Sequence, residues 1–256
     1  MNEMPRIVTV DASNVEKEGF FCFKSKPKTT GYKRKLSWLK ERINEGLVIK
    51  ILDYGKRSFA FIEYIPGAHG WRTVHAPDHM LIHCIWVVGS GKKRGFGSLL
   101  LDECFDDARQ KGLKGVATVT SSQTWLADSK FFLKRGFERV DSAPPSFELL
   151  SYDFETVEPP RFPSDWDDRI LHFGEGFTIV RTDQCPYVDD ATKIFQNAAA
   201  DRGIDCTIVS LDTRDQLMER SPSAFGVFAV TYKGDLFTYH YLTEREIAKR
   251  LEELES

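Results

Sequence analysis

The sequence lacks several features that would place it in a membrane, outside the cell or around a metal ion. No stretch approaches the ~18 consecutive apolar residues of a transmembrane helix, and Glu3 and Asp11 stand where a secretory signal would be apolar. The five cysteines form no tight pair and no Cys-x-x-Cys, so neither a disulfide framework nor a metal site is expected. We therefore expect a soluble, cytoplasmic protein without a membrane partner.

The composition is that of a globular protein with two electrostatically different parts. Hydrophobic residues make up 41% and charged residues 29% of the 256 positions, enough for one large domain or two ordinary ones. Residues 1–160 hold 24 Lys and Arg against 20 Asp and Glu, whereas residues 161–256 hold 11 against 18. Because the sign of the net charge changes along the chain, we expect two units with different partners.

Three prolines mark the place where the charge changes sign. Pro159, Pro160 and Pro163 remove backbone donors and favour an extended conformation, as a semi-rigid linker would. The predicted organisation is a first domain at 1–157, a Pro-rich linker at 158–169 and a second domain at 170–256.

The first domain alternates strand and helix patterns, which predicts an α/β or α+β fold with a mixed central sheet flanked by helices. The run Met80–Val88 is almost continuously apolar, as in a central strand covered on both faces. The other strands are expected at Arg6–Val10, Val48–Asp53, Ser58–Tyr64, Gly115–Val119 and Phe147–Tyr152, and the helices at Tyr32–Glu45, Ser98–Gln110 and Thr124–Lys134.

A glycine-rich segment with three cations joins the central strand to the next helix. It reads Val87-Val88-Gly89-Ser90-Gly91-Lys92-Lys93-Arg94-Gly95-Phe96-Gly97-Ser98. Glycines let the backbone approach a ligand, and the helix that follows offers unpaired N–H groups and the positive end of its dipole. The segment matches neither the Walker A loop nor the three-glycine dinucleotide pattern. The combination suits a pyrophosphate.

Two motifs about forty residues apart resemble the GCN5-related N-acetyltransferase (GNAT) family. Lys92-Lys93-Arg94-Gly95-Phe96-Gly97 resembles the Arg/Gln-x-x-Gly-x-Gly/Ala loop, with Lys at the first position. Phe131-Phe132-Leu133-Lys134-Arg135-Gly136-Phe137 resembles the later aromatic-x-Lys-x-Gly-Phe segment. The resemblance covers most of the first domain and implies acetyl-CoA, or another acyl-CoA, as co-substrate and an amine as acceptor.

The resemblance also implies roles for individual residues. The backbone amides of Val87 and Val88 would polarise the thioester, and Phe132 stands where many relatives carry the Tyr that protonates the CoA thiolate. The residues expected on the cofactor are Val87, Val88, Lys92, Lys93, Arg94, Gly95, Phe96, Gly97, Ser98, Ser129 and Phe132.

Two side chains compete for the role of the base that takes a proton from the attacking amine. His83 lies four residues before Val87, where family members often place an acidic base, and an unperturbed imidazole suits the task. Glu63, on the neighbouring predicted strand, is the alternative. A histidine in an apolar strand can equally be a packed, hydrogen-bonded residue, so both catalytic roles are expectations.

The second domain shows a β-α-β-α-β-β-α pattern that resembles the thioredoxin/glutaredoxin fold. Cys185-Pro186-Tyr187-Val188 resembles the glutaredoxin Cys-Pro-Tyr-Cys site with Val at the second cysteine, which excludes dithiol exchange within the motif. A cysteine at a helix N-terminus is favoured as thiolate, so Cys185 is a candidate thiol site. An acetyltransferase joined to such a domain resembles the YoaP-like bacterial proteins.

The sequence thus predicts an acetyl-CoA-dependent N-acetyltransferase acting on a small-molecule or peptide amine. The alternatives are a thiol-linked redox or sensing protein that uses Cys185, and a catalytically silent acyl-CoA-binding protein. Residues 19–35 interleave aromatic and basic side chains, but the pI of about 6.1 argues against a nucleic-acid partner. The pattern leaves a homodimer open.

Overall fold

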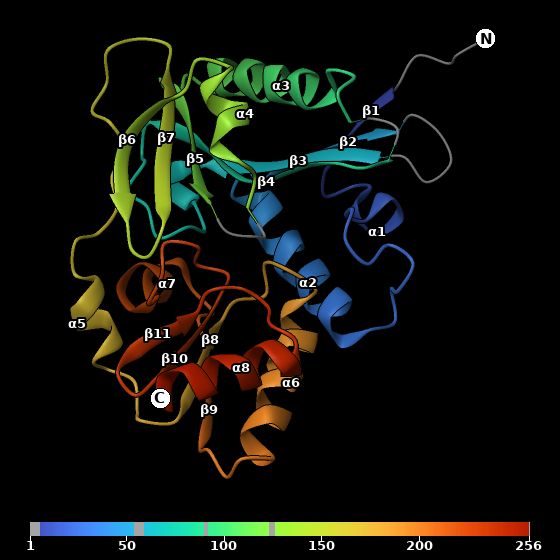
Figure 1. Ribbon diagram of the computed structural model, residues 1–256. Coiled ribbons are helices and arrows are strands. Elements are labelled where there is room, and N and C mark those ends of the chain that lie inside the picture. Colours follow the sequence, from blue (N-terminus) through green and yellow to red (C-terminus); the bar gives the residue numbers. More distant parts are fainter. Residues whose placement is uncertain (1–5, 54–58, 90–91, 123–125, 256) are drawn as a thin grey trace. The chain divides into compact units, whose positions relative to one another are not determined.

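The computed structural model describes residues 6–53, 59–89, 92–122 and 126–255, and the chain divides into two compact units. Unit 1 comprises residues 1–27, 36–70 and 74–162, and unit 2 comprises residues 28–35, 71–73 and 163–256. Each unit has its own sheet (Figure 1). The last change of unit falls at Phe162 and Pro163, within the expected linker, which also contains the start of helix α5 (Trp166–Ile170).

Unit 1 is built on a seven-stranded mixed sheet in the order β1-β2-β3-β4-β5-β7-β6. Strands β4 and β5 are parallel, and every other neighbouring pair is antiparallel. The mixed α/β architecture expected from the sequence is therefore confirmed. The strands are β1 (Arg6–Val10), β2 (Val48–Asp53), β3 (Phe59–Pro66), β4 (His79–Val87), β5 (Gly115–Ser121), β6 (Glu138–Ala143) and β7 (Phe147–Asp153).

Helices flank this sheet, and α3 packs its apolar side into the main core. Leu100, Leu101, Cys104 and Ala108 are fully buried there, at the i, i+1, i+4 and i+8 spacing of one helix face. The helices are α1 (Val15–Glu18), α2 (Thr30–Asn44, of which residues 30–35 lie in unit 2), the short 3₁₀ helix η1 (Gly67–His69), α3 (Phe96–Gln110) and α4 (Ser129–Leu133).

Helix α4 is shorter than the Thr124–Lys134 helix expected from the sequence. The carboxylate of Asp128 accepts a hydrogen bond from the Lys130 backbone N–H at 2.9 Å, so Asp128 is the N-cap and the helix begins at Ser129. Thr124 itself lies outside the described residues.

A buried polar network holds α3 onto β2 and β3. The Lys50 ammonium donates to Glu103 at 2.7 Å and to Asp107 at 3.1 Å, and the Tyr64 hydroxyl donates to the other Asp107 oxygen at 2.6 Å. Burial raises the pKa of the Tyr64 hydroxyl, and its hydrogen bond to Asp107 adds to the shift. Burial lowers the pKa of Lys50, but the hydrogen bonds to both carboxylates outweigh this and raise it overall. The network fixes the position of α3, and with it the N-terminus of that helix.

Unit 2 has a four-stranded sheet in the order β11-β10-β8-β9, with β8 and β9 parallel. The order of its elements is the expected β-α-β-α-β-β-α. Phe195 of α6 packs against Phe177 of β8 and Phe237 of β11, so α6 covers that face of the sheet. The elements are β8 (Phe177–Arg181), α6 (Val188–Ala200), β9 (Cys206–Ser210), α7 (Arg214–Arg220), β10 (Phe228–Tyr232), β11 (Asp235–Thr238) and α8 (Glu244–Glu255).

None of the helices in the described ranges combines the length and the apolar character that crossing a lipid bilayer requires.

Candidate active site

The N-terminus of α3 carries neither a side-chain cap nor an acidic residue. Gly95 is its N-cap, in the left-handed region at φ 82°, and the first helical hydrogen bond runs from the Leu99 N–H to the Gly95 carbonyl at 3.0 Å. No side chain caps this end, and its first turn carries no acidic residue, whereas α6, α7 and α8 all begin with Asp or Glu in their first turns. The N–H groups of the first turn and the positive dipole end are therefore available to an external anion.

Three exposed cations precede this helix end. Lys92, Lys93 and Arg94 are exposed, and none of them forms an ion pair within the part of the chain that the structure describes. The Arg94 guanidinium lies 4.9 Å from the centre of the Phe96 ring, which keeps it beside the helix start. Ser90 and Gly91 of the same loop lie outside the described residues. The loop and the helix end together present positive charge to solvent.

Gly97 marks where α3 meets the later motif. A Cβ at Gly97 would lie 3.3 Å from two atoms of the Phe131 ring and 3.7 Å from a methyl of Val87, so only glycine fits without displacing a neighbour. The loop, the end of β4 and the start of α4 therefore converge at this point. Phe131 opens the aromatic-x-Lys-x-Gly-Phe motif but was not among the residues expected on the cofactor.

The two adjacent phenylalanines of α4, Phe131 and Phe132, differ in burial. Phe131 is half-buried beside Gly97, and Ser129 is also half-buried. Phe132 is completely buried, with its ring 5.2 Å from that of Phe137. The Phe132 ring thus belongs to the core rather than to a surface that a ligand would touch, unlike the expectation from the family position.

Strands β4 and β5 diverge just before the loop. Their parallel pairing runs from His79 to Ile82 on β4 and ends there, whereas β4 remains paired with β3 as far as Val87. The pairing of β3 with β4 contains a bulge at the same level, because the partners change from Glu63 and Cys84 to Tyr64 and Ile82. The bulge and the end of pairing open the sheet beside the last residues of β4.

Glu63 and His83, the two candidate bases, lie together at this bulge. The His83 Nδ1 is 3.4 Å from a carboxylate oxygen of Glu63, and the two side chains are 1% and 7% exposed, His83 being the more buried. The Trp38 ring, 6.3 Å from the imidazole, covers the pair from α2. A carboxylate beside an imidazole can orient it and stabilise its protonated form, so the pair can accept a proton.

An exposed tryptophan lies on the same stretch of β4. Trp86 directly precedes the loop and is 46% exposed, although it sits on a central strand. Phe61 is its cross-strand partner and stacks on Phe21 at 4.8 Å. The expectation that Met80–Val88 is covered on both faces is wrong at Trp86, since one side of β4 stays open there.

Cys185 in unit 2 lies in the turn that precedes α6. It is half-buried, and its carbonyl accepts a hydrogen bond from the Val188 N–H at 3.2 Å. Val188, at the position of a second cysteine, is completely buried. Gln184 fixes the turn, because it donates to the Gly226 carbonyl at 2.8 Å and accepts from Arg72 at 2.6 Å.

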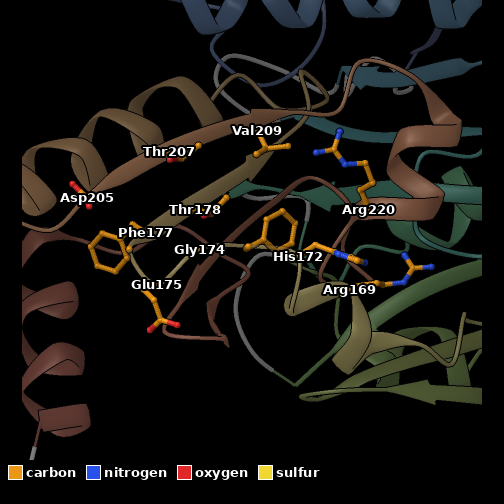
Figure 2. Close-up of a pocket in the computed structure, with 12 residues that line it drawn as sticks. Arg169, His172, Gly174, Glu175, Phe177, Thr178, Asp205, Thr207, Val209 and Arg220 are labelled. Carbon is orange, nitrogen blue, oxygen red and sulfur yellow. The ribbon is translucent and has the colours of Figure 1, made fainter.

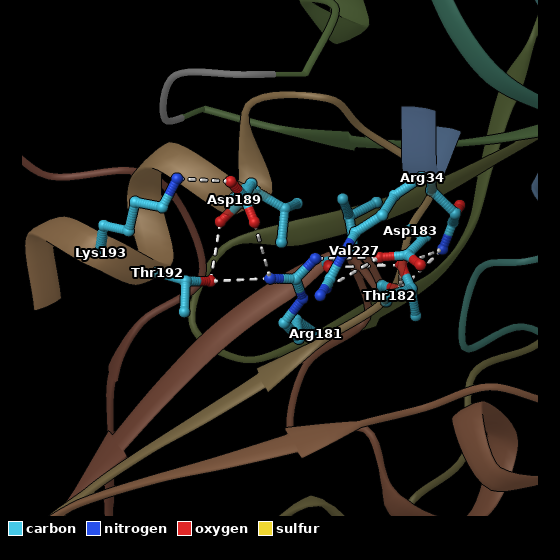
Figure 3. A network of polar contacts seen from close by, with 11 residues as sticks. Arg34, Arg181, Thr182, Asp183, Asp189, Thr192, Lys193 and Val227 are labelled. Atoms are coloured by element: carbon cyan, nitrogen blue, oxygen red, sulfur yellow. Dashed lines mark hydrogen bonds and ion pairs between the residues drawn. The ribbon is translucent and has the colours of Figure 1, made fainter. Parts of the chain in front are cut away.

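A buried arginine network surrounds the same turn (Figure 3). Arg181 is 5% exposed, and its guanidinium donates to Asp183 at 2.9 Å and to the Thr192 hydroxyl at 3.3 Å. Arg34 lies 3.8 Å from the same Asp183, and Asp189 accepts from Lys193 at 2.8 Å. The network ties the turn to α6, which is a structural role.

Known proteins are similar to this chain at two levels, as a family that matches part of it and as a relative that matches nearly all of it. The model of the acetyltransferase (GNAT) family matches residues 14–137. The chain is 28% identical over 251 residues to a Bacillus subtilis (strain 168) protein described as the uncharacterized N-acetyltransferase YoaP, covering 96% of this chain and 98% of that one.

Solved acetyltransferases also resemble part of the chain. The PaiA N-acetyltransferase from Thermoplasma acidophilum, in complex with coenzyme A, is 13% identical and matches 59% of this chain and 99% of its own, with a TM-score of 0.41. An N-acetyltransferase from Staphylococcus aureus Mu50 is 13% identical over 60% of this chain and 100% of its own, with a TM-score of 0.42.

Proposed function

Since the chain carries an acetyltransferase domain of the GNAT family, we propose that it transfers an acetyl group from acetyl-CoA to a primary amine. The observation that carries this proposal is the uncapped N-terminus of α3, which follows three exposed cations and a strand that separates from its neighbour. An anionic pyrophosphate fits the helix end, and a thioester fits the opening beside β4.

The donor is held by the backbone and by the loop cations. The N–H groups of Phe96, Gly97 and Ser98 would donate to the pyrophosphate, and Lys92, Lys93 and Arg94 would add long-range attraction. The N–H groups of Val87 and Val88, past the end of pairing with β5, would donate to the thioester oxygen as negative charge develops there.

The Glu63–His83 pair would act as the base. The amine nitrogen attacks the thioester carbon, the new C–N bond forms as the C–S bond breaks, and the surplus amine proton passes to the pair. Phe132 has no hydroxyl to protonate the leaving group and is buried, so CoA would leave as thiolate. This is tolerable because a free thiol has a pKa near ~8.5.

Binding of the donor gives the direct test. Acetyl-CoA at about a hundred times its dissociation constant is expected to add about 2.7 kcal/mol of stability, or about 5–10 °C in the unfolding midpoint, with free CoA acting similarly. Thermal unfolding with each ligand measures this. An unchanged midpoint with both would contradict the donor site.

The open face at Trp86 is proposed to receive the acceptor. Trp86→Ala is expected to raise KM for 2-phenylethylamine about tenfold, because the contact between the indole ring and the phenyl ring of this amine is lost. KM for acetyl-CoA should stay the same. Steady-state kinetics with both substrates varied would measure it. Leu254→Ala, which changes another exposed apolar residue, on α8, is the matched control and should leave both KM values unchanged.

Unit 2 is proposed to be a thioredoxin-like module joined to the acetyltransferase. Its element order and the strand order β11-β10-β8-β9 support this. Because Val188 is buried at the second-cysteine position, the module is proposed to serve binding or assembly rather than dithiol exchange.

A further inference from the structure

Unit 2 contains a cavity that the proposed acetyl transfer does not use. Its volume is about 410 Å³, within the range of about 300–1,000 Å³ typical of small-molecule sites. Its lining comes from α5, the connection that leads to β8, the strands β8 and β9, and the end of α7 (Figure 2). All of these residues belong to unit 2.

The floor of this cavity is one face of the sheet. Thr178 of β8 pairs in parallel with Thr207 of β9, and Val180 pairs with Val209, so these side chains lie on the same face. The opposite face is covered by α6 through Phe177 and Phe195. The two threonine hydroxyls and the Val209 side chain therefore give the cavity a partly polar, partly apolar floor.

One end of the cavity is basic. Arg169 is 6% exposed and is held in place, because it donates to the Asp165 carboxylate at 2.8 Å and to the Ser221 carbonyl at 3.3 Å. Arg220 precedes Ser221, is exposed, and forms no ion pair within the described part of the chain. Two arginines thus line the same end: Arg169, which is ion-paired with Asp165, and Arg220, whose guanidinium is available to an anion.

The other end is acidic, and Figure 2 shows Glu175 and Asp205 apart from the two arginines. The two acidic residues are held on adjacent segments, since the Phe177 N–H donates to the Asp205 carbonyl at 2.8 Å. A Cβ on Gly176 would lie 2.3 Å from that carbonyl, so only glycine permits this approach. Both carboxylates are exposed and form no ion pair with any described residue.

We propose that this cavity binds a small zwitterion, with its carboxylate or phosphate at Arg169 and Arg220 and its ammonium at Glu175 and Asp205. Separated opposite charges at the two ends favour a ligand that carries the complementary charges. An aliphatic middle would lie over Val209, between the charged ends. All residues of this site belong to unit 2, and binding there does not require the proposed acetyl transfer.

A series of ω-amino acids tests this site in the full-length chain without acetyl-CoA. Glycine, 4-aminobutyrate and 6-aminohexanoate place the same two charges at increasing separations, and hexanoate and hexylamine carry one charge each. Isothermal titration calorimetry is expected to show saturable binding that is strongest at one chain length. Each singly charged analogue should bind at least about tenfold more weakly, because one charged end then lacks its partner.

Substitutions at each end separate this site from unspecific binding. Arg220→Gln is expected to weaken the preferred ω-amino acid about tenfold, as is the double change Glu175→Gln with Asp205→Asn. Arg245→Gln removes an exposed arginine of α8 outside the cavity and should leave the affinity unchanged. Three outcomes would each overturn the proposal. Hexanoate could bind as tightly as 6-aminohexanoate, or Arg220→Gln and Arg245→Gln could weaken binding equally. The third is that no ω-amino acid shows saturable binding at concentrations up to about 10 mM, the weakest useful affinity.

Discussion

Gly95→Glu is expected to lower the affinity for acetyl-CoA at least about 100-fold. Gly95 has φ 82°, a region that costs an ordinary L-residue about 1–2 kcal/mol, so the helix start would have to rearrange. The new carboxylate would also stand at the N-terminus of α3, where it would take the place of the pyrophosphate and repel it. Isothermal titration with acetyl-CoA measures the loss.

The far end of the same helix offers a matched control. Gly112 has φ 69° and, like Gly95, has no other atom within 4 Å of the position that a Cβ would occupy, so Gly112→Glu adds the same charge with comparable backbone strain. It follows the C-terminus of α3, away from the loop. Acetyl-CoA affinity should survive in Gly112→Glu. If both variants bind normally, the pyrophosphate does not sit at the start of α3.

Glu63→Gln is expected to lower kcat by about 10²–10⁴-fold while acetyl-CoA affinity stays the same. The amide keeps the shape of the carboxylate but cannot hold a proton or stabilise a protonated His83, which lies 3.4 Å away. Steady-state kinetics and acetyl-CoA titration together separate the two effects. The pH profile gives a further signature: the kcat of the unmodified enzyme should fall as pH falls and the base becomes protonated.

Two comparisons decide whether the pair acts as a unit. His83→Asn should lose about as much kcat as Glu63→Gln, and the double variant should lose little more, because residues of one proton relay are not additive. Glu138→Gln, an exposed residue on β6 of the same sheet, should retain full activity. Unchanged kcat in both single variants of the pair would rule out this base.

The main elements could be predicted because their sequence patterns are local. The apolar periodicity of α3 and the β-rich runs of β2, β4 and β7 predicted the positions of these elements to within about two residues. Such patterns are informative because the apolar residues recur on the buried face of each element. Strand β6 and helix α5 were missed. Strand β6, Glu138–Ala143, is largely polar and does not alternate between buried and exposed residues, so it lacks the pattern that marks a strand.

Local sequence patterns could not predict the contacts between segments that are distant in the chain. Nothing in the run Met80–Val88 indicates that pairing with β5 ends at Ile82 or that Trp86 stays half-exposed, because both depend on segments that are distant in the chain. The Phe131 ring meets Gly97 only because α4 returns to the start of α3. The cavity of unit 2 likewise combines segments from α5 to α7, whose charges are unremarkable in the sequence.

The sequence by itself was enough to predict the donor loop, because Gly95, Gly97 and the three cations would act through backbone freedom and charge, which are properties of adjacent residues. It also determined the order of elements in both units. Only the tertiary structure decided that Glu63 and His83 meet, that Phe132 is core and Phe131 is not, and that opposite charges line one cavity. These depend on strand register and helix packing, which bring together side chains far apart in the chain.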